Sequence, residues 1–134
     1  MLTIIMINET HRSTIYPWHC DFNNHMNVQY YVAKFDEATW HFLHQIGYSK
    51  EVLKAKNASM VAVEQHIKYY KELIAGDLIY IKSSLIKGTD KTIKFSHKMY
   101  NAQTNKVAAD TELIAMMIDN VSRKSIHIKK INQF

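Results

Sequence analysis

The sequence contains very few of the residues that build disulfide-bonded, multi-cysteine metal-binding or linker-rich proteins. Its 134 residues include one cysteine, one proline and three glycines. A single cysteine, Cys20, excludes a disulfide within the chain and any zinc or iron–sulfur site built from several cysteines. The length allows a sizeable apolar core without such crosslinks. We therefore expect one reduced, cytoplasmic domain over residues 1–134.

Long apolar stretches and blocks of like charge are also absent. The apolar opening, residues 1–7, is followed at once by Asn8 and Glu9. It is too short to span a membrane, and it lacks the basic start and the cleavage site of a signal peptide. The formal net charge of +5 comes from 17 basic and 12 acidic residues that are dispersed along the chain. This charge favours polyanionic partners in general and identifies none of them.

Apolar residues recur every three or four positions between about Asn27 and Ile46, which predicts one long amphipathic helix. Asn27 is a suitable N-terminal cap, and Gly47 is a suitable C-terminal stop. The apolar stripe consists of Val28, Tyr31, Val32, Phe35, Ala38, Phe42, Leu43 and Ile46.

After Gly47 the pattern changes to a period of two, so we expect only strands there. Between Met60 and Tyr69 the odd-numbered residues share one predicted face and the even-numbered residues share the other. Short turns join the later strands, and four successive strands predict an antiparallel meander covered by the single helix, an α+β domain. The predicted strands are Asn8–Pro17, Met60–Tyr69, Leu78–Ile86, Thr92–Tyr100 and Lys106–Asp119.

Polar side chains are concentrated just before the helix. Residues 18–27 contain two histidines, a cysteine, one aspartate and three asparagines. Aspartate and asparagine are common in turns and at helix N-termini, which is the structural explanation. The functional explanation is that helix N-terminal N–H groups stabilise an oxyanion while Asp21 serves as base or nucleophile in acyl transfer. The composition leaves both explanations open.

A metal site is not expected from the histidine spacing. His19 and His25 lie six residues apart across a loop, and His41 and His44 lie three apart on the predicted helix. No further cysteine or carboxylate completes a tetrahedral ligand set with either pair.

The segment D-F-N-N-H-M-N-V-Q-Y-Y, which begins at Asp21, resembles the D-x-x-G-H-V/M-N-x-x-x-Y motif of hotdog-fold acyl-CoA thioesterases of the 4-hydroxybenzoyl-CoA thioesterase type. The similarity extends from about Glu9 to Asp119 and is closest to the betainyl-CoA thioesterases. It implies an antiparallel sheet wrapped around a central helix and a homodimer, or a dimer of dimers, with active sites at the subunit interface. Coenzyme A would be part of the substrate, and no cofactor is implied. Asn24 replaces the usual glycine of the motif, and asparagine tolerates the left-handed backbone conformation.

The resemblance also implies roles for four residues of this motif. Asp21 would be the catalytic carboxylate, either the nucleophile or the general base, and the backbone N–H near Val28 would be the oxyanion donor. His25 and Asn27 would orient the loop and the thioester. Direct proton transfer is the alternative role for His25, and a plain helix cap is the alternative for Asn27.

Six further residues are candidates for substrate binding: Tyr30, Tyr31, Glu64, His66, Lys87 and Lys91. The tyrosines would line the acyl pocket, and the strand that carries Glu64 and His66 would border the site of a partner chain. The lysines flank a predicted hairpin turn and would meet the phosphates of coenzyme A. The structural alternatives are core packing, an exposed strand face and a solvated hairpin.

Two other functions are compatible with the same fold. A hydratase usually pairs a histidine and a carboxylate in a different frame around the helix, an arrangement that this sequence does not show. A non-catalytic module would bind acyl-CoA or nucleic acid, but no recognisable motif interleaves aromatic residues with lysine or arginine. We therefore expect an acyl-CoA substrate and a second copy of the chain as partners, and neither membrane nor nucleic acid.

Overall fold

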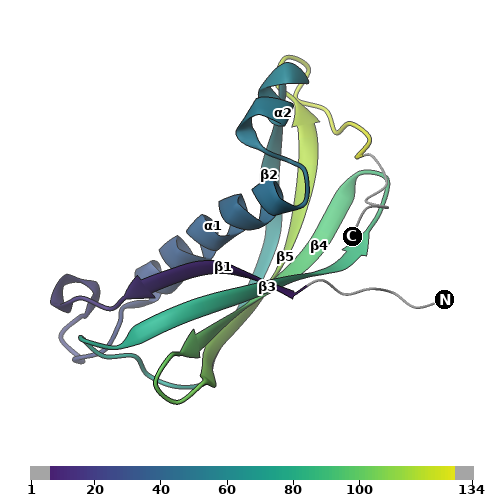
Figure 1. Ribbon diagram of the computed structural model, residues 1–134. Helices are drawn as coiled ribbons and strands as arrows, with labels where there is room; N and C mark the ends of the chain where they lie inside the picture. Colours follow the sequence, from purple (N-terminus) through teal and green to yellow (C-terminus); the bar gives the residue numbers. More distant parts are fainter. Residues whose placement is uncertain (1–6, 129–134) are drawn as a thin grey trace.

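A curved antiparallel sheet packs around one long helix in the computed structural model, which describes residues 7–128 (Figure 1). This arrangement confirms the predicted α+β class and the hotdog fold. The strands are β1 (Ile7–Thr14), β2 (Ala58–Tyr69), β3 (Leu78–Gly88), β4 (Thr92–Asn101) and β5 (Lys106–Asp119). The helices are α1 (Val28–Gln45), α2 (Lys50–Ala55) and a single 3-10 turn, η1 (Pro17–His19). Neither α-helix in the described range is long and apolar enough to cross a membrane.

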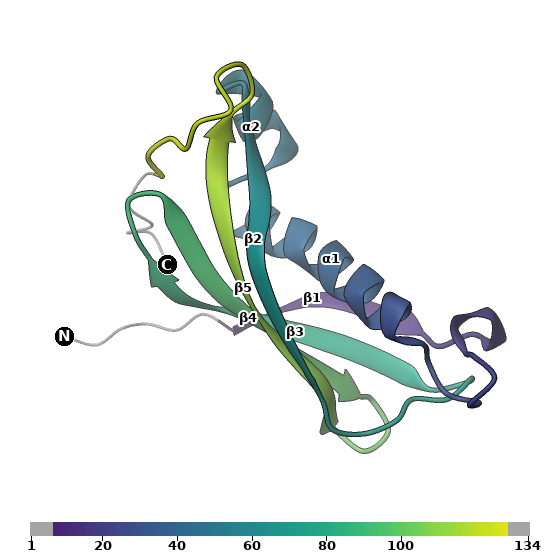
Figure 2. The ribbon, with the colours of Figure 1, turned by 180° about the vertical axis from the view of Figure 1, so that it is seen from behind.

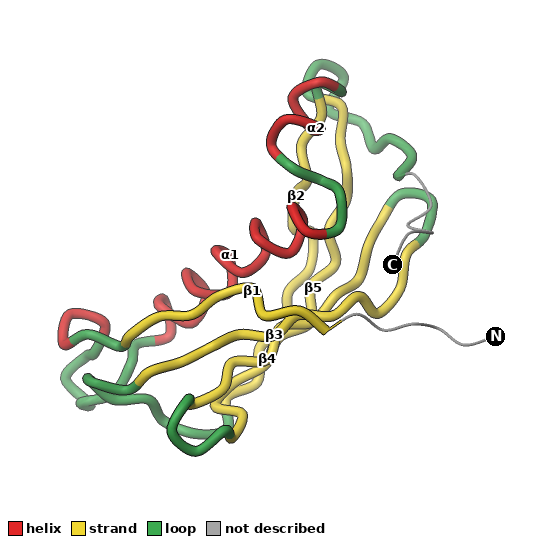
Figure 3. Tube along the Cα trace, in the orientation of Figure 1, coloured by secondary structure: helices red, strands yellow, loops and turns green. Residues whose placement is uncertain are grey.

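Helix α1 has the boundaries that its sequence predicts. Asn27 caps the N-terminus, because its side-chain Oδ1 accepts the Gln29 N–H at 3.1 Å. Ile46 is the C-terminal cap, and Gly47 follows with a φ of +100°, a conformation that favours glycine. The helix lies on the concave side of the sheet (Figure 3) and buries one face against it, including Phe35 and Phe42.

The sheet order is β1-β3-β4-β5-β2. The prediction that four successive strands are neighbours is therefore wrong for β2, which pairs with β5 and lies at an edge of the sheet (Figure 2). The cause is the connector of residues 70–77, which is longer than a hairpin loop and is anchored by the fully buried Leu73. The backbone N–H groups of Tyr70 and Lys71 both donate to Ala108 O, so this connector passes the start of β5 before it enters β3.

The side chains of β2 do not alternate regularly between the two faces of the sheet. The register of β2 with β5 shifts at a bulge between Ala62 and Glu64, so the predicted division into odd and even faces is wrong. Met60 and Ile67 both pack into the core although one is even-numbered and the other odd-numbered. A bulge inserts one unpaired residue and thereby exchanges the two faces.

The expectation of strands alone after α1 is also wrong. The short helix α2 begins after Ser49, whose Oγ accepts the Val52 N–H at 3.3 Å. Leu53 on α2 is buried against the core. A serine cap before an amphipathic turn is a local helix signal, and it places α2 at the end of the sheet where β2 begins.

Two apolar clusters fill the space between α1 and the sheet, one under each half of the helix. His97 lies where they meet: it is fully buried, and its ring contacts Phe35 of one cluster and Phe42 of the other. Its two ring nitrogens are hydrogen-bonded to Thr39 Oγ1 at 2.9 Å and to Ser83 Oγ at 2.5 Å. Burial lowers the pKa of His97 to about 3, so the ring is neutral at pH 7.

Candidate functional site

The loop between η1 and α1 folds back on itself as a small hairpin. The Asn24 N–H donates to Asp21 O at 2.9 Å, and the Asp21 N–H donates to His25 O at 3.2 Å. Cys20 and Met26 close the hairpin as an isolated bridge. Asn24 has a φ of +65°, the left-handed conformation expected at the position where the motif usually has glycine. An asparagine therefore builds the same turn.

Two other segments hold this loop at the start of α1. The Met26 N–H donates to Leu73 O at 2.7 Å, which ties the loop to the connector between β2 and β3. The Ile15 N–H donates to Asp77 O at 2.8 Å, which ties the end of β1 to the same connector. The loop is thus fixed by long-range backbone contacts as well as by its own turn.

The carboxylate of Asp21 is held in place from both sides. Its Oδ2 accepts the side-chain N–H of Asn27 at 2.9 Å, and its Oδ1 accepts the Asn23 N–H at 2.8 Å. These two bonds, the Asn27 one first, lower the pKa of Asp21 below its ordinary value. Asp21 is therefore ionised at neutral pH, as a nucleophile or general base must be.

Asn27 connects this carboxylate to the helix end. Its side chain donates to Asp21 through Nδ2 and accepts the Gln29 N–H through Oδ1, while its backbone oxygen accepts the Tyr30 N–H at 3.0 Å. Within residues 7–128 the Val28 N–H has no acceptor, and Val28 is 57% exposed. A backbone N–H with no acceptor in the described range, at the positive end of the helix, therefore lies next to the residue that positions the carboxylate.

His25 faces a residue that the sequence did not single out. Its Nε2 lies 3.8 Å from Glu72 Oε1 in the connector between β2 and β3. His25 also contributes, after the two hydrogen bonds, to lowering the pKa of Asp21. No sequence signal pointed to Glu72, because the contact depends on the path of the connector across the end of the sheet.

The two candidate tyrosines lie in different surroundings. Tyr30 is half-buried, with its ring centroid 4.8 Å from that of His19. Tyr31 is only 4% exposed, and its ring meets the ring of Tyr69 at 5.0 Å. Burial raises the pKa of Tyr31 to about 12. In the single chain Tyr31 is thus part of the core, while Tyr30 lies close to the loop.

Three exposed aromatic side chains, Tyr16, Trp18 and Phe22, lie in or just before the loop. Trp18 stacks on Tyr16 with ring centroids 4.4 Å apart and an interplanar angle of 10°. Phe22, next to Asp21, is 94% exposed. Exposed aromatic surface beside a held carboxylate is typical of a site that receives a ligand or a second protein surface.

The remaining candidates do not join this cluster within one chain. Glu64 and His66 are exposed on β2, opposite Ile114 and Glu112 of β5. Lys87 and Lys91 flank the turn at the C-terminal end of β3. The N-terminal end of β3 pairs with Thr14, which lies near the loop that carries Asp21. A strand of 11 residues is about 33 Å long, so these lysines lie at the far end of the sheet from Asp21.

The described residues show no metal-binding group. Among residues 7–128 no three side chains of histidine, cysteine, aspartate or glutamate converge. Cys20 is half-buried, with its Sγ 3.8 Å from Tyr16 O.

Known proteins with similar sequences carry thioesterase names. An L-carnitine dehydrogenase/betainyl-CoA thioesterase of Rhizobium sp is 24% identical over 106 residues, covering 79% of this chain and 21% of the relative. The chain thus spans about a fifth of that relative's length. A betainyl-CoA thioesterase of Pseudomonas aeruginosa is 21% identical over 109 residues, covering 81% of this chain and 69% of the relative.

Structure and family comparison agree with this similarity. A hypothetical protein of Staphylococcus aureus, solved in complex with CoA, superposes with a TM-score of 0.84 at 21% identity, covering 98% of this chain and 80% of that one. This likeness shows a common fold. The family model described as the thioesterase-like superfamily matches residues 15–131. Since that match spans most of the sequence, the chain belongs to the thioesterase-like superfamily.

Proposed function

We propose that this protein hydrolyses acyl-CoA thioesters, with Asp21 as the catalytic carboxylate and the Val28 N–H as the oxyanion donor. The observation that carries the proposal is the Asn27 side chain, which holds the ionised Asp21 carboxylate and also caps the helix that presents the free amide. Membership of the thioesterase-like superfamily and the names of the relatives support the reaction class.

The general-base route begins with a water molecule between Asp21 and the thioester carbon. Asp21 takes a proton from the water molecule while the water oxygen bonds to the carbonyl carbon. The carbonyl electrons move onto the carbonyl oxygen, which accepts a hydrogen bond from the Val28 N–H. Collapse of this intermediate re-forms the carbonyl group and breaks the C–S bond. Coenzyme A leaves as a thiolate, which takes up the proton, and the acyl group leaves as a carboxylic acid.

The nucleophilic route uses the same groups. An Asp21 oxygen bonds to the carbonyl carbon, the C–S bond breaks with release of the thiolate, and an anhydride joins Asp21 to the acyl group. Water then cleaves this anhydride. A single turnover in ¹⁸O-labelled water identifies the nucleophilic route where water attacks the Asp21 carbonyl of the anhydride, because the label then enters the Asp21 side chain. The general-base route leaves Asp21 unlabelled.

Betainyl-CoA is the first substrate to test. Two relatives are named for that activity, and a quaternary ammonium group is attracted to aromatic ring faces. The exposed rings of Trp18, Tyr16 and Phe22 lie around the loop that carries Asp21. A panel of betainyl, aromatic and medium-chain acyl-CoA thioesters, compared by kcat/KM, will identify the acyl class.

We further propose that two copies of the chain join along β2. This strand has 12 residues and pairs only with β5 within the described range, so its outer edge is free to pair with another strand. Val63 at that edge is 54% exposed. Such pairing would place Glu64 and His66 beside the partner chain, as their predicted role requires. Sedimentation should show a dimer or a larger even-numbered assembly, and Val63→Glu should weaken it.

The direct test of the proposed function is Asp21→Asn. The variant keeps the size of the side chain and removes its charge, so thiol release from the best acyl-CoA of the panel should fall steeply while the circular dichroism spectrum stays unchanged. Asp90→Asn, which alters an exposed carboxylate in the β3–β4 turn, is the matched control and should retain activity. Full activity of Asp21→Asn would refute the mechanism.

One observation favours a second function, non-catalytic binding of single-stranded nucleic acid. On the outer face of the sheet the rings of Tyr80 and Tyr100 stack at 4.9 Å. Arg12 and Lys82 lie 5.2 Å and 5.9 Å from the Tyr80 ring centroid. These residues come from three strands, which is why no linear motif revealed them. Oligonucleotide binding that weakens steeply with salt, together with no thioester turnover, would favour this function.

A further inference from the structure

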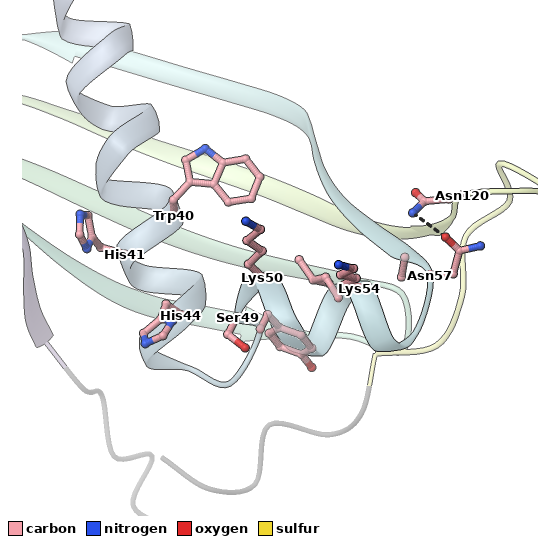
Figure 4. A pocket seen from close by; sticks show the side chains of 11 residues that line it. Trp40, His41, His44, Ser49, Lys50, Lys54, Asn57 and Asn120 are labelled. Atoms are coloured by element: carbon pink, nitrogen blue, oxygen red, sulfur yellow. Dashed lines mark hydrogen bonds between the residues drawn. The ribbon is translucent and has the colours of Figure 1, made fainter.

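A second candidate site lies at the opposite end of α1 from Asp21. An open cavity of about 830 Å³ is lined by the last turns of α1, by α2 and by the start of β2 (Figure 4). Tyr48, Leu53 and Ala58, all buried, contribute apolar surface to it. Cavities of roughly 300–1,000 Å³ are typical of small-molecule sites.

Trp40 provides a free aromatic surface in this cavity. It is 53% exposed, and within residues 7–128 its indole has no stacking or cation–π partner. Trp18, the other tryptophan, is in contrast stacked on Tyr16. A large exposed indole without a ring partner is available to stack on the flat ring of a ligand.

The charged side chains that line the cavity are two lysines. Lys50 and Lys54 line it together with His41 and His44, and its described lining residues include no aspartate or glutamate. Across residues 7–128 neither lysine ammonium group makes a salt bridge or a side-chain hydrogen bond. In Figure 4 Lys50 extends toward Trp40 from α2. Unpaired cations beside an apolar wall attract an anion that carries an apolar body.

From this combination we propose that the cavity binds an organic anion with a flat ring, the ring resting on Trp40 and the anionic group on Lys50 and Lys54. Two sources share this chemistry: a free aromatic carboxylate, and the nucleotide half of a coenzyme A molecule. The site does not overlap the Asp21 site of the same chain, because 18 helical residues, about 27 Å, separate the two ends of α1. The proposal therefore does not rest on the proposed hydrolysis.

The experiment is calorimetric titration of the full chain with two probes, 2-naphthoate and adenosine 3′,5′-bisphosphate. We expect saturable binding of at least one probe, weakened at higher salt, and weakened by about tenfold in the double variant Lys50→Ala, Lys54→Ala. Trp40→Leu should also weaken binding of the probe, although this substitution leaves the charge of the cavity unchanged. In a Trp18→Phe background Trp40 is the only tryptophan, so its emission should change on binding. The preferred probe identifies the source of the ligand.

Lys56→Ala is the matched control, because Lys56 is an exposed lysine that follows α2 and does not line the cavity. It should bind the probes as the unaltered chain does. Circular dichroism checks that each variant is folded. The proposal is overturned if neither probe binds saturably, or if binding survives the loss of both lysines. It is also overturned if Lys56→Ala weakens binding as much as the double variant does.

Discussion

The two ends of α1 carry different kinds of site. At the N-terminal end, Asp21, Asn27 and the Val28 amide lie within eight residues of sequence, and the Asn27 side chain bonds both to the Asp21 carboxylate and to the Gln29 N–H. At the C-terminal end, the cavity is lined by residues from α1, α2, β2 and the segment after β5. The first end is ordered around one fixed carboxylate, whereas the second offers unpaired cations and an exposed indole.

The two proposed sites would use the two ends of one helix in different ways. The N-terminal end has free N–H groups and positive potential, which suit a developing oxyanion. The C-terminal end lacks such donors, so side chains must supply positive charge there, and Lys50 and Lys54 do so. A site for chemistry needs fixed geometry, whereas a site for binding an anion needs charge and apolar surface.

The largest expected effect is a loss of kcat at the N-terminal end of α1, without a change in binding at the C-terminal end. Asp21→Asn should reduce kcat by about 100- to 10,000-fold, the range typical of a lost catalytic base. It should leave binding of 2-naphthoate or the bisphosphate at the other end of α1 unchanged. Thiol-release kinetics and calorimetry on the same preparation measure both quantities. Loss of both together would show that the two ends are coupled.

Acid should destabilise both ends together through His97, which joins the two core clusters. Its pKa is lowered to about 3 in the folded chain and is near 6.5 when unfolded. Below pH 6.5 the unfolded chain therefore binds a proton that the folded chain does not, and stability falls as the pH drops from 6.5 toward 3. At pH 4.5 the expected loss is about 3 kcal/mol.

Urea unfolding at pH 7.5 and pH 4.5 tests this prediction. The variant His97→Gln stays neutral at both pH values, so its free energy of unfolding should change less between them than that of the unaltered chain. An equal change in both proteins would mean that other groups control the acid response.

Asn27→Ala should affect the N-terminal end alone. The helix loses its cap, which costs about 1 kcal/mol of stability, and Asp21 loses the bond that lowers its pKa most. The pKa of Asp21 should therefore rise toward its ordinary value, and kcat should fall. Asn23→Ala is the matched control, because Asn23 holds Asp21 through its backbone N–H, which alanine retains. Equal losses in both variants would contradict the role of the Asn27 side chain.

The smallest effect is expected at Asn24. Asn24→Gly should change the free energy of unfolding and kcat very little, since glycine readily adopts the observed φ of +65°. Asn24→Val should cost about 1–2 kcal/mol, because a β-branched side chain disfavours the left-handed conformation. Thermal unfolding of the two variants measures the difference. A valine variant as stable as the glycine variant would show that the turn is not held in this conformation.

The sequence predicted the N-terminal end well because its contacts are local. The Asn27 cap and the turn at Asn24 depend on residues a few positions apart, and the structure has both. Of the eight residues of the predicted helix stripe six are buried, whereas Val28 and Val32 are exposed, so the stripe is wrong at these two positions. The structure also places Asp21 beside the helix end, as the motif indicated, although its catalytic role stays a prediction.

What the sequence did not predict depends on long-range packing. The bulge at Ala62/Glu64 exchanges the faces of β2, and an alternating pattern does not reveal it. The neighbour of β2 is decided by the path of the connector around Leu73, which also creates the His25–Glu72 contact. The cavity at the other end of α1 brings together four segments, so no spacing in the sequence indicates it.

The measurement that tests the central claim most directly compares Val28→Pro with Val28→Ala. Proline is well tolerated at the first helical position, and the extended backbone of Asn27 is compatible with a following proline. Proline removes only the N–H that should bind the oxyanion, whereas alanine keeps it. We expect kcat to fall by about 100- to 1,000-fold in the proline variant and to stay within about twofold in the alanine variant. Equal kcat values for two folded variants would contradict the account.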